Sequence, residues 1–258
     1  MTQQTRDWLA GFARHFDLPG DYLVFDIETS GGSAEEDVVT QVGYVVVQGG
    51  HAVDSFEFVL GWPGSGLVDE LQLRRRLEDT LWRSQQHGRV LPMSWERMQL
   101  EGVPPLDGLN DLFSLLESCQ KSLVPLVAHG GYRFDCRMLL GADQRFARRG
   151  FQFSDNELYD TGSIERGSQT MAPLRPGETL AACCRRLLGG KQKAYWNLHE
   201  HCASKYDLTA RLPAPAAQSH NAGYDALLTH FLFEQFRDMA GVSQSAAALR
   251  SAQELATP

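Results

Sequence analysis

Two acidic residues, Asp26 and Glu28, lie at and just past the end of a short apolar run, 22–25, that predicts a buried strand. Side chains two positions apart on a strand point to the same face. Two carboxylates on one face repel each other unless a cation lies between them, and a divalent metal ion is the usual cation. The spacing therefore indicates a metal site, with a strand-end turn bearing solvated acids as the alternative.

Asp135 is the third candidate ligand, and it opens an expected helix over 135–149. An aspartate at a helix start is also an ordinary cap, so this residue alone leaves both interpretations open. The pair Gly130-Gly131 just upstream favours a functional interpretation. Glycines let a backbone turn sharply or approach a ligand closely.

His220 and Asp225 lie around the start of a long expected helix over 222–239. Residues five apart do not share a helix face, so we expect His220 before the helix and Asp225 in its first turns. His220 could then lie over a site that Asp225 helps to build. The alternative is that Ser219 or Asn221 caps the helix and His220 is an exposed loop residue.

The elements that carry these residues follow from the spacing of apolar side chains. Strands are expected over 22–25, 38–47, 52–60 and 123–128, and helical segments over 6–16, 67–118, 135–149, 178–188, 196–206 and 222–239. Gly49-Gly50 indicates a hairpin of the second and third strands. Pro125 weakens the strand pattern there or places the fourth strand near an edge of the sheet. This order predicts an α/β domain with a mixed sheet.

The composition is that of an ordinary globular protein, with 258 residues, 43% of them hydrophobic and 22% charged. This length suits one large domain or one domain with decorations. No apolar run reaches the ~18 residues that span a bilayer, and we expect neither a secretory signal nor membrane association. The five cysteines are scattered and odd in number, which fits a reducing compartment and predicts a cytoplasmic location.

The net charge of −8 argues against a protein that coats duplex nucleic acid by neutralising its phosphates. It does not exclude an enzyme that acts on a strand end, because bound divalent cations invert the local sign of a carboxylate site. Basic clusters lie at 74–76, 145–149, 185–186 and 191–193. We expect each cluster to form a solvated helix face.

Taken together and in this order, the candidate residues resemble the motifs of the DEDDh exonucleases, which belong to the ribonuclease-H-like superfamily. The first motif covers residues 24–31, the second 126–135 and the third 220–229. The third fits the family form His-x-Ala-x-x-Asp-Ala-x-x-Thr at every fixed position. The resemblance covers about residues 21–236. One departure is Gly130, which stands where the family usually has Asn, and it concerns substrate contacts more than metal binding.

The resemblance implies a ribonuclease-H-like mixed β-sheet flanked by helices and a 3′→5′ exonuclease that releases nucleoside 5′-monophosphates from the 3′ end of DNA or RNA. It implies two Mg²⁺ or Mn²⁺ ions held by Asp26, Glu28, Asp135 and Asp225, whose oxygens suit such hard cations. Two ions ~4 Å apart can clamp the attacking water and the leaving oxygen. His220 would be the general base, since the usual pKa of histidine is near neutral pH.

The same resemblance implies contacts between the terminal nucleotide and Ile27 and Thr29, through backbone and hydroxyl groups. His129 and Tyr132 are expected along the path of the strand, where aromatic faces can stack on bases. A core position is the alternative for Tyr132, and we expect Phe134 to be a core residue.

The expected domain organisation is a leading helix over 1–20, an exonuclease domain over 21–240, and a weakly ordered tail over 241–258. An insertion at about 161–194 exceeds the family minimum. A substrate-gripping arm, an oligomerisation element and a plain surface insertion all remain open for it. The oligomeric state is also open, with a homodimer as one alternative because some family members dimerise.

Two other functions remain alternatives. One is a catalytically silent domain of the same fold that binds nucleic acid or acts as an adaptor, against which the intact acids and histidine argue. The other is a zinc site built from Cys183, Cys184, His199, His201 and Cys202. No Cys-x-x-Cys pair is present, and two histidines two apart on a helix lie about 200° around its axis, so no zinc is expected. The sequence leaves open whether the substrate is DNA or RNA and whether it is a single strand or a duplex end. It also leaves the biological pathway open.

Overall fold

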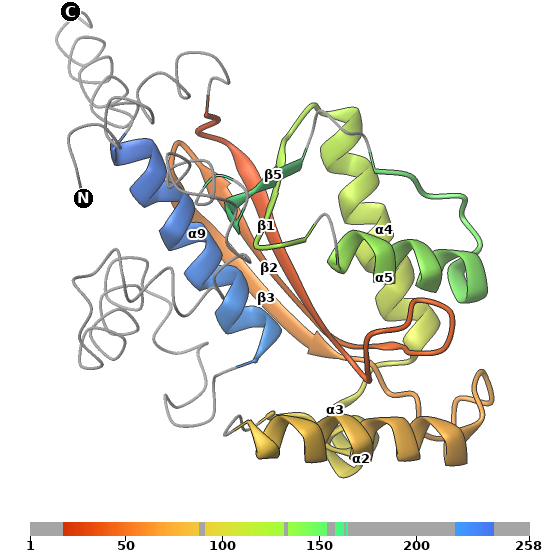
Figure 1. Ribbon diagram of the computed structural model, residues 1–258. Helices are drawn as coiled ribbons and strands as arrows, with labels where there is room; N and C mark the ends of the chain where they lie inside the picture. The colour runs from red at the N-terminus through yellow and green to blue at the C-terminus, as the bar shows by residue number, and fades with distance from the viewer. Residues whose placement is uncertain are drawn as a thin grey trace, which may run out of the picture.

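The computed structural model describes residues 18–87, 91–131, 134–153, 158–162, 164 and 220–239 (Figure 1). Its centre is a five-stranded sheet of order β3-β2-β1-β4-β5. The strands are β1 Tyr22–Thr29, β2 Val39–Gln48, β3 His51–Val59, β4 Leu126–Ala128 and β5 Leu158–Asp160. β2 is antiparallel to β1 and β3, whereas β4 is parallel to β1 and to β5. This arrangement confirms the expected mixed sheet.

The hairpin of β2 and β3 turns at Gly49 and Gly50, as the sequence predicts. Both glycines have positive φ, 56° and 79°, a region that other residues rarely adopt. The turn is fixed to the start of β1, because the Gly50 N–H donates to the Gly20 carbonyl at 2.7 Å. Three consecutive antiparallel strands therefore form one half of the sheet.

Five α-helices surround the sheet in the described residues: α2 Glu70–Gln86, α3 Trp95–Glu101, α4 Pro105–Lys121, α5 Asp135–Ala142 and α9 Ala222–Met239. Two have side-chain N-caps, since Asp69 accepts from the Gln72 N–H and Ser94 accepts from the Arg97 N–H. Pro105 is the first residue of α4, where a missing N–H costs no hydrogen bond. These starts divide the expected helical region into three helices.

The sheet lies between two helical layers, with α9 on one face and α4 and α5 on the other (Figure 1). Side chains of β1 alternate between them. Leu23, Phe25 and Ile27 are buried in the core under α4 and α5, whereas Tyr22 and Val24 are buried with the apolar face of α9. Because side chains alternate along a strand, Asp26 and Glu28 continue the row that faces α9. The strand therefore directs both acids toward the helix that carries Asp225.

One of two strand predictions is wrong. β1 does not end at Asp26 but continues to Thr29, because its pairing with β2 continues through Glu28 opposite Gln41. β4 lies between β1 and the last strand β5, near an edge of the described sheet, as expected. Pro125 precedes β4, and its carbonyl accepts from the Leu23 N–H at 2.9 Å. The missing N–H of this proline therefore costs the ladder nothing.

Two other differences concern the second half of the domain. The three-residue strand β5 was not expected at all, and it forms by parallel pairing with β4. The expected helix over 135–149 is shorter: α5 ends at Ala142, and a π-helical turn, Asp143–Ala147, follows. Arg148 stops that turn with a positive φ of 53°.

Several expectations fall outside the described residues. They are the greater part of the leading helix, nearly all of the 161–194 insertion, the helices over 178–188 and 196–206, the tail over 241–258, the zinc candidates and Tyr132. Among the described helices, none combines the length and the hydropathy needed to cross a membrane.

Candidate metal centre

The structure brings the four predicted acids together from three segments of the chain. Asp26 and Glu28 come from β1, Asp135 from the first turn of α5 and Asp225 from the first turn of α9. Burial raises the pKa of Asp26 well above its ordinary value, and the charges of the other three acids raise it further. Burial likewise raises the pKa of Glu28, together with the charges of Asp225 and Asp135. The charges of the neighbouring acids therefore contribute to the raised pKa values of both Asp26 and Glu28.

The pKa values of the other two acids are also raised, although in each case a backbone hydrogen bond lowers the pKa in part. Burial raises the pKa of Asp135 to about 8, with Asp160 as the next cause and a backbone hydrogen bond opposing it. Burial raises the pKa of Asp225 to about 7, and a backbone hydrogen bond from His220 lowers it in part. Ionising all four acids together is thus unfavourable unless a cation is near.

A divalent cation fits this cluster. In the described part of the chain, no arginine or lysine forms an ion pair with any of the four acids. Glu28, His220 and Asp225 each offer one ligand atom, and these three atoms lie within 4.8 Å of one another. Carboxylate oxygens are the ligands that hard divalent cations prefer. The residues present therefore suit Mg²⁺ or Mn²⁺.

The start of α9 is held on the sheet by a polar network. Asn221 caps the helix, because its Oδ1 accepts from the Tyr224 N–H at 2.9 Å. Its Nδ2 donates to Glu57 Oε1 at 3.1 Å, and the same oxygen accepts from Gln41 Nε2 at 3.0 Å. His220, just before the cap, has a positive φ of 66°. One alternative from the sequence is therefore correct in part: Asn221 is the cap, yet His220 still lies beside the acids.

A second network holds the turn before Asp135. Asp160, at the end of β5, accepts through Oδ1 from the N–H groups of Gly130 and Gly162, both at 2.9 Å. Gly131 has no room for a side chain, because a Cβ atom there would lie 2.4 Å from Ala128 Cβ. The carbonyl of Gly131 accepts from the Cys136 N–H at 2.9 Å and so starts α5. The glycine pair is thus required for a sharp turn that places Asp135.

The sequence did not identify four residues that hold the acid-bearing helices in place. They are Gln41, Glu57 and Asn221, which hold the start of α9 on the sheet, and Asp160, which holds the turn before Asp135. Glu57 and Asp160 are single acids on strands, without the paired spacing that marks Asp26 and Glu28. Glu57 acts through Asn221, 164 residues away, and through Gln41 on the neighbouring strand, and Asp160 acts through Gly130, 30 residues away. No local pattern could have identified them.

The four expected substrate residues lie in different surroundings. The side chain of Ile27 is buried in the core, so only its backbone remains available for a nucleotide. Thr29 Oγ1 donates to the Gly31 carbonyl at 2.6 Å. His129 Nδ1 lies 2.9 Å from Thr161 Oγ1, and Tyr132 is outside the described residues. Phe134 packs against the core, as expected, but also lines an open cleft. Their roles toward substrate remain predictions.

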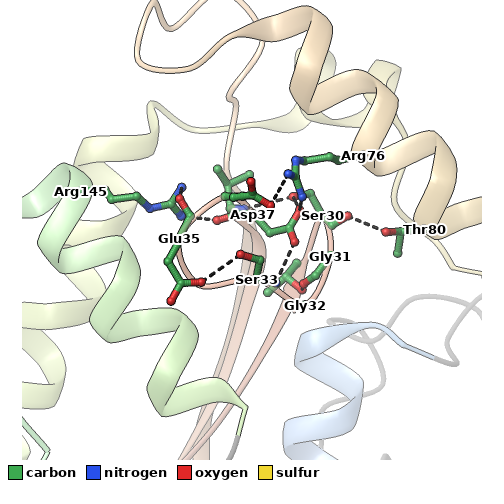
Figure 2. Close-up of polar contacts among 12 residues, drawn as sticks. Ser30, Gly31, Gly32, Ser33, Glu35, Asp37, Arg76, Thr80 and Arg145 are labelled. Atoms are coloured by element: carbon green, nitrogen blue, oxygen red, sulfur yellow. Dashed lines mark hydrogen bonds and ion pairs between the residues drawn. The ribbon is translucent and has the colours of Figure 1, made fainter.

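That cleft adjoins the acids and has a volume of about 720 Å³. One wall contains Glu28, Thr29 and His220, and the opposite wall is formed by α2. Between them lies the β1–β2 loop over 30–38, which Asp37 folds on itself by accepting from Ser30 Oγ at 3.1 Å (Figure 2). The candidate centre is therefore open to a ligand from the side of α2.

Comparison with known proteins shows only distant likeness. No family model and no curated protein matches the chain. The fold is similar to zinc-bound exonuclease I of E. coli in complex with single-stranded DNA, at 14% identity and a TM-score of 0.49, over 85% of this chain and 41% of that one. Product-bound exonuclease I is similar at 12% identity and a TM-score of 0.49, over 85% and 43%. The RNase domain of yeast Pop2 is similar at 12% identity and a TM-score of 0.42, over 92% and 84%.

The chain spans about two fifths of the length of those exonuclease I chains.

Proposed function

We propose that this chain is a metal-dependent 3′→5′ exonuclease acting on DNA or RNA. One observation carries the proposal: four acids from three segments meet in a buried cluster that has no arginine or lysine partner among the described residues. Such a cluster needs a cation to ionise. The order of the acids and His220 along the chain, which resembles the DEDDh motifs, supports the same conclusion.

Asp26, Glu28, Asp135 and Asp225 would hold two Mg²⁺ or Mn²⁺ ions. When bound, such ions stabilise the negative charge that develops on the attacking and leaving oxygens of a phosphodiester. The chain itself supplies the geometry. The sheet fixes the first pair of acids, while the Gly130-Gly131 turn and the cap at Asn221 fix the other two.

His220 would take the proton from the attacking water. Its ring approaches Glu28 and Asp225, with one atom from each of the three residues inside a 4.8 Å group. The same position would also let the ring bind an ion directly. A general base and a ligand are distinguished by experiment: loss of a base lowers kcat and leaves Mn²⁺ affinity unchanged, whereas loss of a ligand weakens Mn²⁺ binding.

The direct test uses a single-stranded oligonucleotide labelled at its 5′ end, in DNA and RNA versions, with Mg²⁺ or Mn²⁺. We expect a ladder of labelled products shortened from the 3′ end, with nucleoside 5′-monophosphates released. Asp26→Asn should abolish the ladder. The matched control is Asp54→Asn, an exposed acid on β3 that accepts from the adjacent Ser55 N–H at 2.9 Å. If the unmutated protein releases nothing from either polymer, or releases the labelled 5′ end first, the proposal is wrong.

A further inference from the structure

Three arginines of α2 line the cleft, in a chain of net charge −8. One is Arg76, and the other two are Arg75 and Arg83. Both side chains are exposed, and neither forms an ion pair or a hydrogen bond with another residue that the structure describes. Adjacent arginines of the same helix are engaged. Arg74 pairs with Glu78 at 3.0 Å, and Arg76 pairs with Glu36 and Asp37. Arg75 is therefore exposed, as expected of a solvated helix face, but unlike Arg74 it also lines the cleft.

The position of α2 along the cleft is fixed by contacts with the β1–β2 loop. Arg76 reaches Asp37 Oδ1 at 3.5 Å, and Thr80 Oγ1 donates to the Ser30 carbonyl at 2.7 Å (Figure 2). From the other side, Arg145 Nη1 donates to the Glu35 carbonyl at 3.1 Å. The loop continues directly from β1, which carries Asp26 and Glu28. The arginine wall is thus tied to the strand that carries two of the acids.

Helical periodicity places these residues in one row. Gln72, Arg75, Asp79 and Arg83 are three or four positions apart and all line the cleft. Arg75 and Arg83 are eight residues apart, which is about 12 Å along the helix axis. Asp79 lies between them and offsets part of their charge. The row therefore presents two separated positive charges rather than one continuous patch.

The cleft also has an apolar part to its lining, at Leu91 and Phe134. Sites for single strands combine a basic groove that follows the backbone with aromatic faces on which bases stack. A volume of about 720 Å³ lies in the range of pockets for small ligands, which suits a few nucleotides rather than a duplex. The volume of the cleft, its two unpaired arginines and its apolar lining therefore all suit a single strand of nucleic acid.

We propose that this cleft binds a single strand of nucleic acid, with Arg75 and Arg83 each holding a backbone phosphate of the strand whose end lies at the acids. The inference rests on the proposed function, because it takes the acid cluster as the place of cleavage. Guanidinium groups form charge-assisted hydrogen bonds with phosphate oxygens. Since they contact the backbone, they bind without sequence preference. The two residues thus set the preference for a polymer over a short substrate.

Binding is tested with the double variant Arg75→Gln/Arg83→Gln and the matched control Arg74→Gln. Fluorescence anisotropy of a labelled single strand, in the presence of Ca²⁺ in place of Mg²⁺, measures Kd over a range of salt concentrations. We expect the double variant to bind roughly tenfold more weakly at low salt, and its salt slope to fall by about 1.4, since each lost contact to a single strand removes about 0.7. Arg74→Gln should match the unmutated protein. DNA, RNA and duplex probes are compared, and the single strands should bind more tightly than the duplex.

Catalysis provides a second measurement. The p-nitrophenyl ester of thymidine 5′-monophosphate is a phosphodiester too short to reach Arg83. The ratio of kcat/KM for an oligonucleotide to kcat/KM for this ester should fall at least tenfold in the double variant, through KM, and stay constant in Arg74→Gln. Circular dichroism confirms that all variants are folded.

The outcomes separate the two proposals. If the double variant binds single strands as tightly as the unmutated protein with the same salt slope, or if Arg74→Gln is equally weak, the phosphate assignment is wrong. Tighter binding of duplex than of single strand also overturns it. If anisotropy follows the expected pattern while neither substrate is hydrolysed, the cleft assignment holds and the exonuclease proposal fails.

Discussion

Gly43 of β2 lies in backbone contact with Ala222, the first residue of α9: a Cβ atom on Gly43 would lie 2.2 Å from the Ala222 carbonyl carbon. Gly43 is also the partner of Asp26 across the sheet. The contact therefore sets how closely the helix carrying Asp225 approaches the strand carrying Asp26. Only a glycine permits this separation.

Gly43→Ala should consequently push α9 away from β1 and misplace Asp225. We expect nuclease activity to fall about a hundredfold, since a displacement of about 1 Å in a catalytic group has an effect of that size. The overpacked contact should also lower the free energy of unfolding by about 1–3 kcal/mol. Gly20→Ala is the control, because its added Cβ would meet nothing closer than 3.4 Å. Unchanged kcat in Gly43→Ala would show that the contact does not set the site.

The metal-free protein should lose stability as the pH rises from about 4 to 8. In the folded protein the pKa of Asp135 is about 8 and that of Asp225 about 7, both raised from 3.8. Over this range the folded state binds more protons than the unfolded state, so stability falls with rising pH. Thermal unfolding in EDTA should give a higher Tm at pH 6 than at pH 8.5. Mn²⁺ should raise Tm more at pH 8.5, where the acids ionise, and a lower Tm at pH 6 in EDTA would contradict the assignment.

Asp26→Asn should stabilise the metal-free protein while abolishing its activity. Burial is the largest cause of the raised pKa of Asp26, followed by the charges of Asp135, Asp225 and Glu28. An amide removes the cost of burying or protonating this group, so Tm in EDTA should rise by several degrees at pH 8 and less at pH 5. Asp54→Asn should leave Tm nearly constant at both pH values. A lower Tm for Asp26→Asn at pH 8 would mean that Asp26 has a stabilising partner in the metal-free state.

The sequence predicts those features that depend on short-range periodicity. Asp26 and Glu28 lie two apart on a strand, and α9 begins at Ala222 as its apolar spacing indicates. The three-residue β5 has no such pattern, because it exists only through pairing with β4. Long-range contacts also decide the roles of Glu57 and Arg75. Whether an acid holds a helix in place, or an arginine lines a cleft, depends on neighbours that local spacing does not specify.

Asp160 illustrates this limit and provides the last prediction. Its Oδ1 accepts two backbone N–H groups, from Gly130 and Gly162, and its charge raises the pKa of Asp135. Asp160→Ala leaves both donors without this acceptor, and should lower the free energy of unfolding by about 1–3 kcal/mol. Asp160→Asn keeps an oxygen acceptor but removes the charge.

The two variants of Asp160 therefore separate its structural and electrostatic roles. Asp160→Asn should retain most of the stability that Asp160→Ala loses. It should also lower the pKa of Asp135, so that in EDTA the fall of Tm with rising pH becomes shallower. Denaturant unfolding and a pH series of Tm in EDTA measure both effects. Equal destabilisation by the two substitutions would indicate that the charge itself, rather than the acceptor oxygen, holds the glycine turn that places Asp135.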